Sequence, residues 1–152
     1  MKLEDCIYFL TTRLSRELRK KFDEFLTDID ITASGWCVLM TIIENNENIT
    51  QREIAEILSL ETPTVTRILD LLQKKGFIKR EPHPEDRRCF IVKLTEKGRK
   101  ITNDIIRYGE CFMSCVTNLL NENDLKLFKE ILKKLYFDIK NVNISSIISC
   151  QN

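Results

Sequence analysis

Hydrophobic residues recur every three or four positions over most of the chain, a period that predicts a mainly helical fold. Residues 3–29 follow this pattern without a break, so we expect one long helix there. Further helices are expected from Thr32 to about residue 43, from Thr95 to about residue 120, and from the polar segment 121–124 to residue 141. They surround a central segment with a different pattern.

The central segment begins with two short helices. Thr50 followed by Glu53 is a capping box, in which each side chain accepts a bond from the backbone amide of the other residue. A second helix is predicted to begin at Thr62, with Pro63 at its first helical position, and Gly76 is expected to end it. Two short helices joined by a tight turn form a helix-turn-helix.

After Gly76 the period changes from helical to alternating. Residues 77–81 and 89–94 are predicted to be two strands, joined by a polar loop that contains two prolines. Ile49 is expected to add a minimal third strand, and Thr95 to cap the next helix. The predicted fold class is therefore mainly α (α+β): a winged helix-turn-helix with long helices at both ends.

The net charge is only +1, but it is unevenly distributed. Residues 62–100 contain 11 Lys and Arg against 5 Asp and Glu, whereas the rest of the chain contains 13 against 18. A basic segment that coincides with a winged helix favours local binding to the phosphates of nucleic acid over a merely solvated charged face.

With 43% hydrophobic and 31% charged residues, and no signal peptide or membrane-length apolar run, the chain is expected to be cytoplasmic. Its six cysteines include no C-x-x-C pair, and Cys111 and Cys115 with the single His83 make a poor zinc site. The sequence has no glycine-rich phosphate loop and no nucleophile elbow. We therefore expect no metal, no cofactor, no membrane contact and no catalytic residues.

Residues 62–98 resemble the recognition helix, wing and following helix start of the MarR family of bacterial transcriptional regulators; they read TPTVTRILDLLQKKGFIKREPHPEDRRCFIVKLTEKG. The resemblance includes Asp86-x-Arg88 in the wing and LTEKG after it, and it is strongest between Ile31 and Lys100. It implies a sequence-specific regulator, a repressor, that binds double-stranded DNA.

The expected domains are a winged helix DNA-binding domain at 31–99, dimerisation helices at 1–30 and 100–141, and a C-terminal tail at 142–152. The end helices carry apolar stripes with no second core to cover them, which favours a homodimer. Two copies of the second short helix would then enter successive major grooves of a pseudo-palindromic operator, about 34 Å apart.

The polar face of the second short helix supplies the candidate base and backbone contacts, which are Thr62, Pro63, Thr64, Thr66, Arg67 and Lys74. Asp70 on the same face is expected to orient Arg67 or Lys74. The candidate wing contacts are Asp86, Arg87 and Arg88, and the resemblance implies that Arg88 enters the minor groove, held by a salt bridge from Asp86. The candidate phosphate contacts are Arg52, Lys79 and Arg80.

MarR-like proteins commonly respond to small aromatic or phenolic ligands, or to oxidation of a cysteine. The resemblance implies a ligand cleft lined by Tyr8, Arg13, Trp36 and the helix after Thr95. Cys6 is the candidate redox residue, although the position expected from the peroxide-sensing branch of the family falls on Tyr8. Two alternatives remain open: a cysteine-based redox-sensing regulator, and a winged-helix protein-docking module that does not bind DNA.

Overall fold

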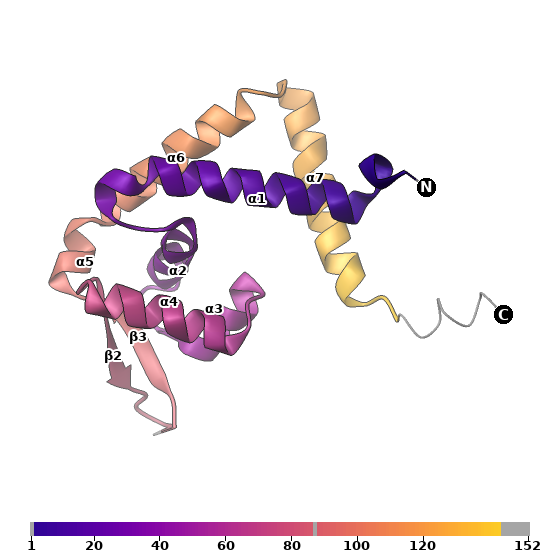
Figure 1. The fold of residues 1–152 in the computed structure, drawn as a ribbon. Coiled ribbons are helices and arrows are strands. Elements are labelled where there is room, and N and C mark those ends of the chain that lie inside the picture. Colours follow the sequence, from indigo (N-terminus) through magenta and orange to yellow (C-terminus); the bar gives the residue numbers. More distant parts are fainter. Residues whose placement is uncertain (1, 87, 144–152) are drawn as a thin grey trace. The chain divides into compact units, whose positions relative to one another are not determined.

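A computed structural model describes residues 2–86 and 88–143 of the chain (Figure 1). The chain divides into two compact units, the first ending at Phe112 and the second beginning at Met113. The first unit holds the whole winged helix and the first long helix. The second holds the end of α6 and all of α7, and each unit is described by itself.

The first segment is not the single long helix that the sequence predicts. It consists of a 3-10 helix η1 (Leu3–Asp5), α1 (Ile7–Phe25) and a second 3-10 helix η2 (Thr27–Ile29). Cys6 is extended, with ψ 117°, which separates η1 from α1. The apolar period continues through this position, so periodicity alone does not reveal the break.

Three helices form the body of the winged helix: α2 (Ala33–Glu44), α3 (Gln51–Leu58) and α4 (Thr62–Lys74). The hydroxyl of Thr32 caps α2 by accepting the amide of Gly35 at 3.1 Å. The predicted capping box of Thr50 and Glu53 is confirmed in both directions. Helices α2 and α3 therefore begin where their capping signals lie in the sequence.

Helix α4 begins at Thr62, as predicted, but its N-cap is Glu61. Pro63 consequently occupies the second helical position and not the first. Proline costs no hydrogen bond there, because the amides of the first turn have no partner inside the helix. At the other end Gly76, with φ 77°, adopts the left-handed conformation that ends the helix.

The antiparallel sheet has the strand order β1-β3-β2, with β1 (Ile49–Thr50), β2 (Ile78–Pro82) and β3 (Phe90–Leu94). Val92 of β3 pairs with Ile49 on one side and with Arg80 on the other. The predicted strands and the minimal third strand are confirmed to within one residue at each end. The β2–β3 hairpin extends away from the helices as the wing (Figure 1).

One hydrophobic core joins α2, α3, α4 and the sheet. Its fully buried members include Val38, Leu39, Ile42, Ile54, Val65, Leu69 and Val92. Val65 and Leu69 belong to α4, so the opposite face of that helix is left for solvent or a ligand. The predicted mainly α winged helix fold is confirmed.

The segment after the wing divides into α5 (Glu96–Lys100) and α6 (Thr102–Thr117), where a single helix was predicted. Ile101 leaves helical geometry, with ψ 1°, and packs against the winged-helix core. Tertiary packing therefore breaks a pattern that is helical throughout. The predicted caps at both ends are confirmed: Thr95 accepts the amide of Gly98 at 3.0 Å, and Asn121 accepts the amide of Asp124 at 2.9 Å.

A second, aromatic core lies between α1, α2 and α6. Phe22 stacks on Phe112, with ring centroids 4.4 Å apart, and meets Trp36 edge-on at 5.1 Å. The indole Nε1 of Trp36 donates a hydrogen bond of 2.7 Å to the carbonyl of Ile105. Gly109 lies directly against the indole ring, which explains a glycine in the middle of a helix.

The second unit is dominated by α7 (Glu122–Lys140), none of whose residues is buried. No described helix is long and apolar enough to span a bilayer. Of the predicted tail 142–152, only Val142 and Asn143 belong to the described residues.

Candidate nucleic-acid interface

The face of α4 that is exposed lies opposite the residues that are buried in the core. Val65, Leu69 and Leu72 are buried, so helical geometry turns their neighbours outward. The exposed residues on that side of the helix include Thr62, Pro63, Thr64, Arg67, Asp70 and Lys74. All the predicted α4 contacts except Thr66 are therefore exposed.

Thr66 is half-buried because two protein groups bind its hydroxyl. The hydroxyl donates to the carbonyl of Thr62 at 2.9 Å and accepts the side-chain amide Nε2 of Gln51 at 2.7 Å. Gln51 is the first residue of α3, so this network joins the start of one helix to the exposed face of the next. The sequence analysis did not single out Gln51, because the contact spans 15 positions and leaves no local pattern.

Arg80 in β2 connects the wing to α4. Its guanidinium forms an ion pair of 2.7 Å with Asp70 and donates a second bond of 2.7 Å to the side chain of Gln73. The expectation that Asp70 orients Arg67 or Lys74 is therefore wrong. Only 20% of the Arg80 side chain is exposed, and its two contacts connect β2 to α4.

The loop at the tip of the wing is held by its own backbone. Asp86 accepts the backbone amide of Arg88 at 2.9 Å and the thiol of Cys89 at 3.5 Å. The expected salt bridge from Asp86 to the Arg88 side chain is not formed in the structure, because the carboxylate closes an Asx-type turn two residues long. His83 accepts the amides of Glu85 and Asp86 through Nδ1, at 3.2 Å each. Arg87 lies outside the described residues.

A groove of about 210 Å³ lies between α3, α4 and the wing. It is lined by Thr50, Gln51, Arg52, Thr62, Arg80, Arg88, Cys89, Phe90 and Val92. Three arginines and the start of α4 therefore meet at one surface. The structure brings together Arg52, Thr62, Arg80 and Arg88, which the sequence analysis proposed from three separate elements.

Ion pairing divides the basic residues of this region into two groups. Arg52 pairs with Glu56 at 2.9 Å, and Lys79 pairs with Glu81 at 2.6 Å. In contrast, the side chains of Arg67, Lys74 and Arg88 are exposed and form no ion pair with another described residue. Three cations on α4 and the wing tip therefore have no counter-charge in the part of the chain that the structure describes.

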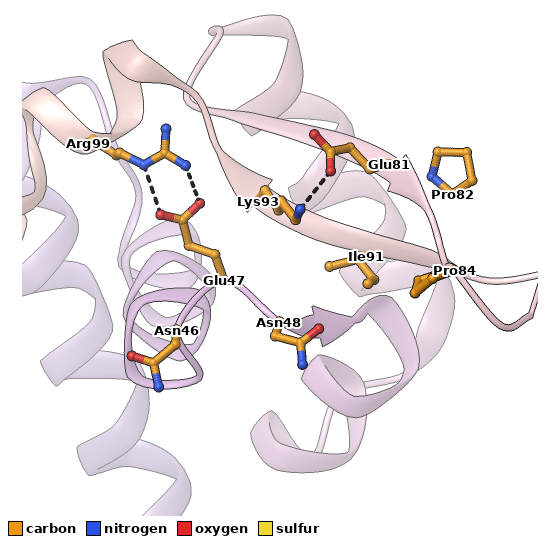
Figure 2. A pocket seen from close by; sticks show the side chains of 9 residues that line it. All are labelled: Asn46, Glu47, Asn48, Glu81, Pro82, Pro84, Ile91, Lys93 and Arg99. Carbon is orange, nitrogen blue, oxygen red and sulfur yellow. Dashed lines mark hydrogen bonds and ion pairs between the residues drawn. The ribbon is translucent and has the colours of Figure 1, made fainter.

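On the opposite face of the sheet, basic and acidic side chains pair with one another (Figure 2). A pocket of about 680 Å³ there is lined by Asn46, Glu47, Asn48, Glu81, Pro82, Pro84, Ile91, Lys93 and Arg99. Arg99 grips both oxygens of Glu47, at 2.9 and 2.7 Å, and Lys93 pairs with Glu81 at 2.7 Å. Glu47 also accepts the amide of Leu94 at 3.1 Å, so these charges fix β3 and α5 to the turn before β1.

Two titratable groups in the wing respond to these contacts. Hydrogen bonds from Lys79 and Lys93 lower the pKa of Glu81 to about 2, so this carboxylate stays charged and its lysines stay engaged. The hydrogen bond that the Cys89 thiol donates to Asp86, with burial as a second cause, raises the pKa of Cys89. A raised pKa makes Cys89 a poor nucleophile at neutral pH.

The residues expected to line a ligand cleft do not meet. Tyr8 lies on the first turn of α1 and is 78% exposed. Trp36 packs against Phe22, which lies 14 positions after Tyr8 on α1, or about 21 Å further along the helix axis. Arg13 lies over the ring of Phe9, at 5.4 Å from its centroid. Trp36 is a core residue of the aromatic cluster.

A different cavity, of about 400 Å³, lies between the end of α1, η2 and α6. It is lined by Glu24, Phe25, Asp28, Arg107, Tyr108 and Cys111. The rings of Phe25 and Tyr108 meet edge-on at 5.3 Å. The sequence analysis named the two long helices but not these residues, because a surface cavity has no periodic signal.

Cys6, the redox candidate, is half-buried at the N-cap of α1. It is a free thiol, as are Cys37, Cys89, Cys111 and Cys115. Burial raises the pKa of Cys37. No described group of three or more His, Cys, Asp or Glu side chains could hold a metal ion.

A helix-turn-helix followed by a basic-tipped hairpin defines the winged helix-turn-helix class of proteins. The model of the MarR family matches residues 31–90 of the chain. SarZ, an HTH-type transcriptional regulator of Staphylococcus aureus, is 34% identical over 100 residues, which cover 66% of this chain and 66% of SarZ. That match spans slightly less than two thirds of the relative's length.

Two solved structures are similar over nearly their whole length. A mutant MarR from E. coli in complex with operator DNA is 31% identical, with a TM-score of 0.75 over 83% of this chain and 90% of that chain. MepR of S. aureus in complex with DNA is 25% identical, with a TM-score of 0.79 over 88% of this chain and 98% of that chain. The chain belongs to the MarR family, as the sequence predicts, and the relatives named here are transcriptional regulators of that family.

Proposed function

We propose that this chain is a repressor that binds double-stranded DNA sequence-specifically, with α4 in the major groove and the wing tip at the neighbouring minor groove. The observation that carries the proposal is that α4 and the wing tip together expose three cations without an acidic partner among the described residues. Arg67 and Lys74 on α4, together with Arg88 on the wing, have no acidic partner among the described residues, whereas the basic groups behind the sheet are neutralised. Phosphates would supply the missing counter-charge.

The individual residues then have separable roles. Arg67 can bind two acceptors of one guanine in the major groove. Arg88 can enter the negative potential of a narrow minor groove, because Asp86 engages only its backbone and leaves its guanidinium unpaired. Arg52, Lys79 and Arg80 already have acidic partners, so we assign them at most a secondary contact with phosphates.

A binding assay at several salt concentrations tests this function. The full chain is titrated against the DNA upstream of its own gene and against a sequence selected from a random library. We expect binding that weakens steeply as salt rises, and Arg67→Ala to weaken it by about 5- to 150-fold. Lys126→Ala on α7 is the matched control and should leave affinity unchanged. Binding to no DNA at low salt would overturn the proposal.

We further propose that the chain acts as a homodimer on a pseudo-palindromic operator. Apolar side chains on α7 are open to solvent, with Leu127 at 55%, Ile131 at 46% and Leu135 at 45% exposure. On the first helical segment, Leu3, Ile7, Leu10 and Leu14 are exposed as well. Exposed apolar surface of this extent is typical of an interface between subunits.

Light scattering after size-exclusion chromatography measures the mass in solution. We expect twice the chain mass of 17.9 kDa. Ile131→Glu should shift the mass towards the monomer and weaken DNA binding together with it. A wild-type protein that is monomeric at micromolar concentration would contradict the proposed dimer but not the proposed contacts of α4 and the wing with DNA.

The cavity beside Phe25 and Tyr108 supports a small-ligand effector, because two aromatic edges line a space of suitable size. We propose that an aromatic or phenolic effector binds there and lowers DNA affinity by favouring another spacing of the two recognition helices. Phenol is a suitable probe: it should release DNA from the wild type and not from Tyr108→Ala. Release that is equal in both variants would place the effector elsewhere.

A further inference from the structure

The hydroxyl of Thr66 has no proton left for a DNA base. A threonine hydroxyl has one hydrogen, and the bond to the Thr62 carbonyl at 2.9 Å uses it. The amide of Gln51, at 2.7 Å, occupies one of the two acceptor positions. Both contacts lie within the protein, so the polar branch of the side chain points back to α4 and across to α3.

Fixing the hydroxyl also fixes the methyl group. The two substituents of the threonine β-carbon occupy different staggered positions, so the methyl cannot share the direction of the hydroxyl. Thr66 follows the buried Val65 and precedes the exposed Arg67, at the edge of the open face of α4. With the hydroxyl engaged inside the protein, the methyl is the branch of this half-buried side chain that is left for a contact with DNA.

We propose that Thr66 reads the 5-methyl group of a thymine through its own γ-methyl, and that Gln51 is the positioning residue that holds it in this orientation. The proposal rests on the DNA-binding function above and specifies its base preference. The thymine methyl is an apolar feature of the major groove that distinguishes A·T pairs from the others. Contact between two methyl groups needs no hydrogen bond, which suits a side chain whose hydroxyl is already engaged.

The size of the effect follows from burial of one methyl group. Replacing the contacted thymine by uracil, which lacks only that methyl, should weaken binding about fourfold for one half-site and about fifteenfold when both half-sites are changed. A hydrogen bond from the hydroxyl to a base would not respond to this replacement. Uracil substitution therefore separates the two modes of reading.

The experiment replaces each thymine of a selected operator by uracil, one position at a time, and measures the affinity of five forms of the full chain. In the wild type we expect one uracil-sensitive position per half-site that depends on residue 66. Thr66→Ser keeps the hydroxyl and its two partners but removes the methyl, so it should bind DNA and lose the discrimination at that position. Thr66→Val keeps a methyl and should retain the discrimination.

Gln51 is tested through the same readout. In Gln51→Met the new side chain has a similar length but cannot donate a hydrogen bond to the Thr66 hydroxyl. We therefore expect the ratio of affinities for the thymine and uracil operators to fall towards one. In the double variant Gln51→Met with Thr66→Val, discrimination should return, because valine needs no anchor. Thermal melting of each variant checks that the winged helix is folded.

Discrimination that persists in Thr66→Ser, or that disappears in Thr66→Val, would overturn the inference. So would a wild type with no position whose uracil sensitivity depends on Thr66. These results leave DNA binding itself intact, whereas a wild type that binds no DNA at all refutes the proposed function.

Discussion

Gly109 allows α6 to pack directly against Trp36, and Gly109→Ala should remove that contact. A β-carbon built at Gly109 falls within 2.9 Å of the indole Cε2 and still closer to Cζ2, well inside van der Waals distance. The ring cannot move freely, because its Nε1 is bonded to the carbonyl of Ile105 and its edge meets Phe22. The substitution must therefore shift either the helix or the indole.

The magnitude is a difference between opposing effects. Alanine improves helix propensity by about 1 kcal/mol. Overpacking costs about 1–3 kcal/mol, and a lost indole hydrogen bond costs about 1–1.5 kcal/mol more. We therefore expect Gly109→Ala to lower the free energy of unfolding by about 1–3.5 kcal/mol.

Urea denaturation followed by circular dichroism, at one protein concentration, measures this loss. Gly35→Ala is the matched control: Gly35 is a buried helical glycine whose added β-carbon would meet its neighbours at 3.3–3.5 Å, so we expect a change of less than about 1 kcal/mol. The cost of Gly109→Ala should shrink in a Trp36→Phe background, where the larger ring is gone. Equal cost in both backgrounds, or an alanine variant as stable as the wild type, would refute the packing argument.

Three further predictions concern the wing. In a double-mutant cycle on urea denaturation, Arg80→Ala and Asp70→Ala should be non-additive by about 0.5–1 kcal/mol; additivity would deny the link between β2 and α4. Asp86→Asn should lower the pKa of Cys89 and speed its alkylation at pH 8, measured by mass spectrometry, because the carboxylate that disfavours the thiolate is gone; an unchanged rate would count against that contact. The Glu81 pKa is depressed from 4.5 to about 2, so its stabilisation is present above pH 4.5 and lost as pH falls towards 2. The difference in denaturation midpoint between wild type and Glu81→Gln should narrow over that range, and a constant difference would contradict it.

Short-range signals accounted for most of the fold. The caps at Thr32, Thr50, Thr95 and Asn121 depend on residues three positions apart, so the sequence alone is sufficient to locate them. The break at Ile101 was missed because it depends on packing against a distant core, which apolar periodicity does not record.

The candidate site divides in the same way. The exposed face of α4 could be predicted from helical spacing, and it agrees with the structure. The partners of its polar groups could not, because Arg80 meets Asp70 across a helix and a strand, and Gln51 meets Thr66 across two helices. Which polar side chain pairs with which depends on how the helices and strands pack together.

The link from Arg80 to Asp70 and Gln73 has a consequence for how such a regulator changes its target. Because Arg80 joins the β2–β3 hairpin to α4, a substitution that changes the orientation of α4 should also change the orientation of the hairpin. We therefore expect a change of operator preference to come from substitutions of exposed side chains on α4 and the wing, while the angle between α4 and the hairpin stays the same.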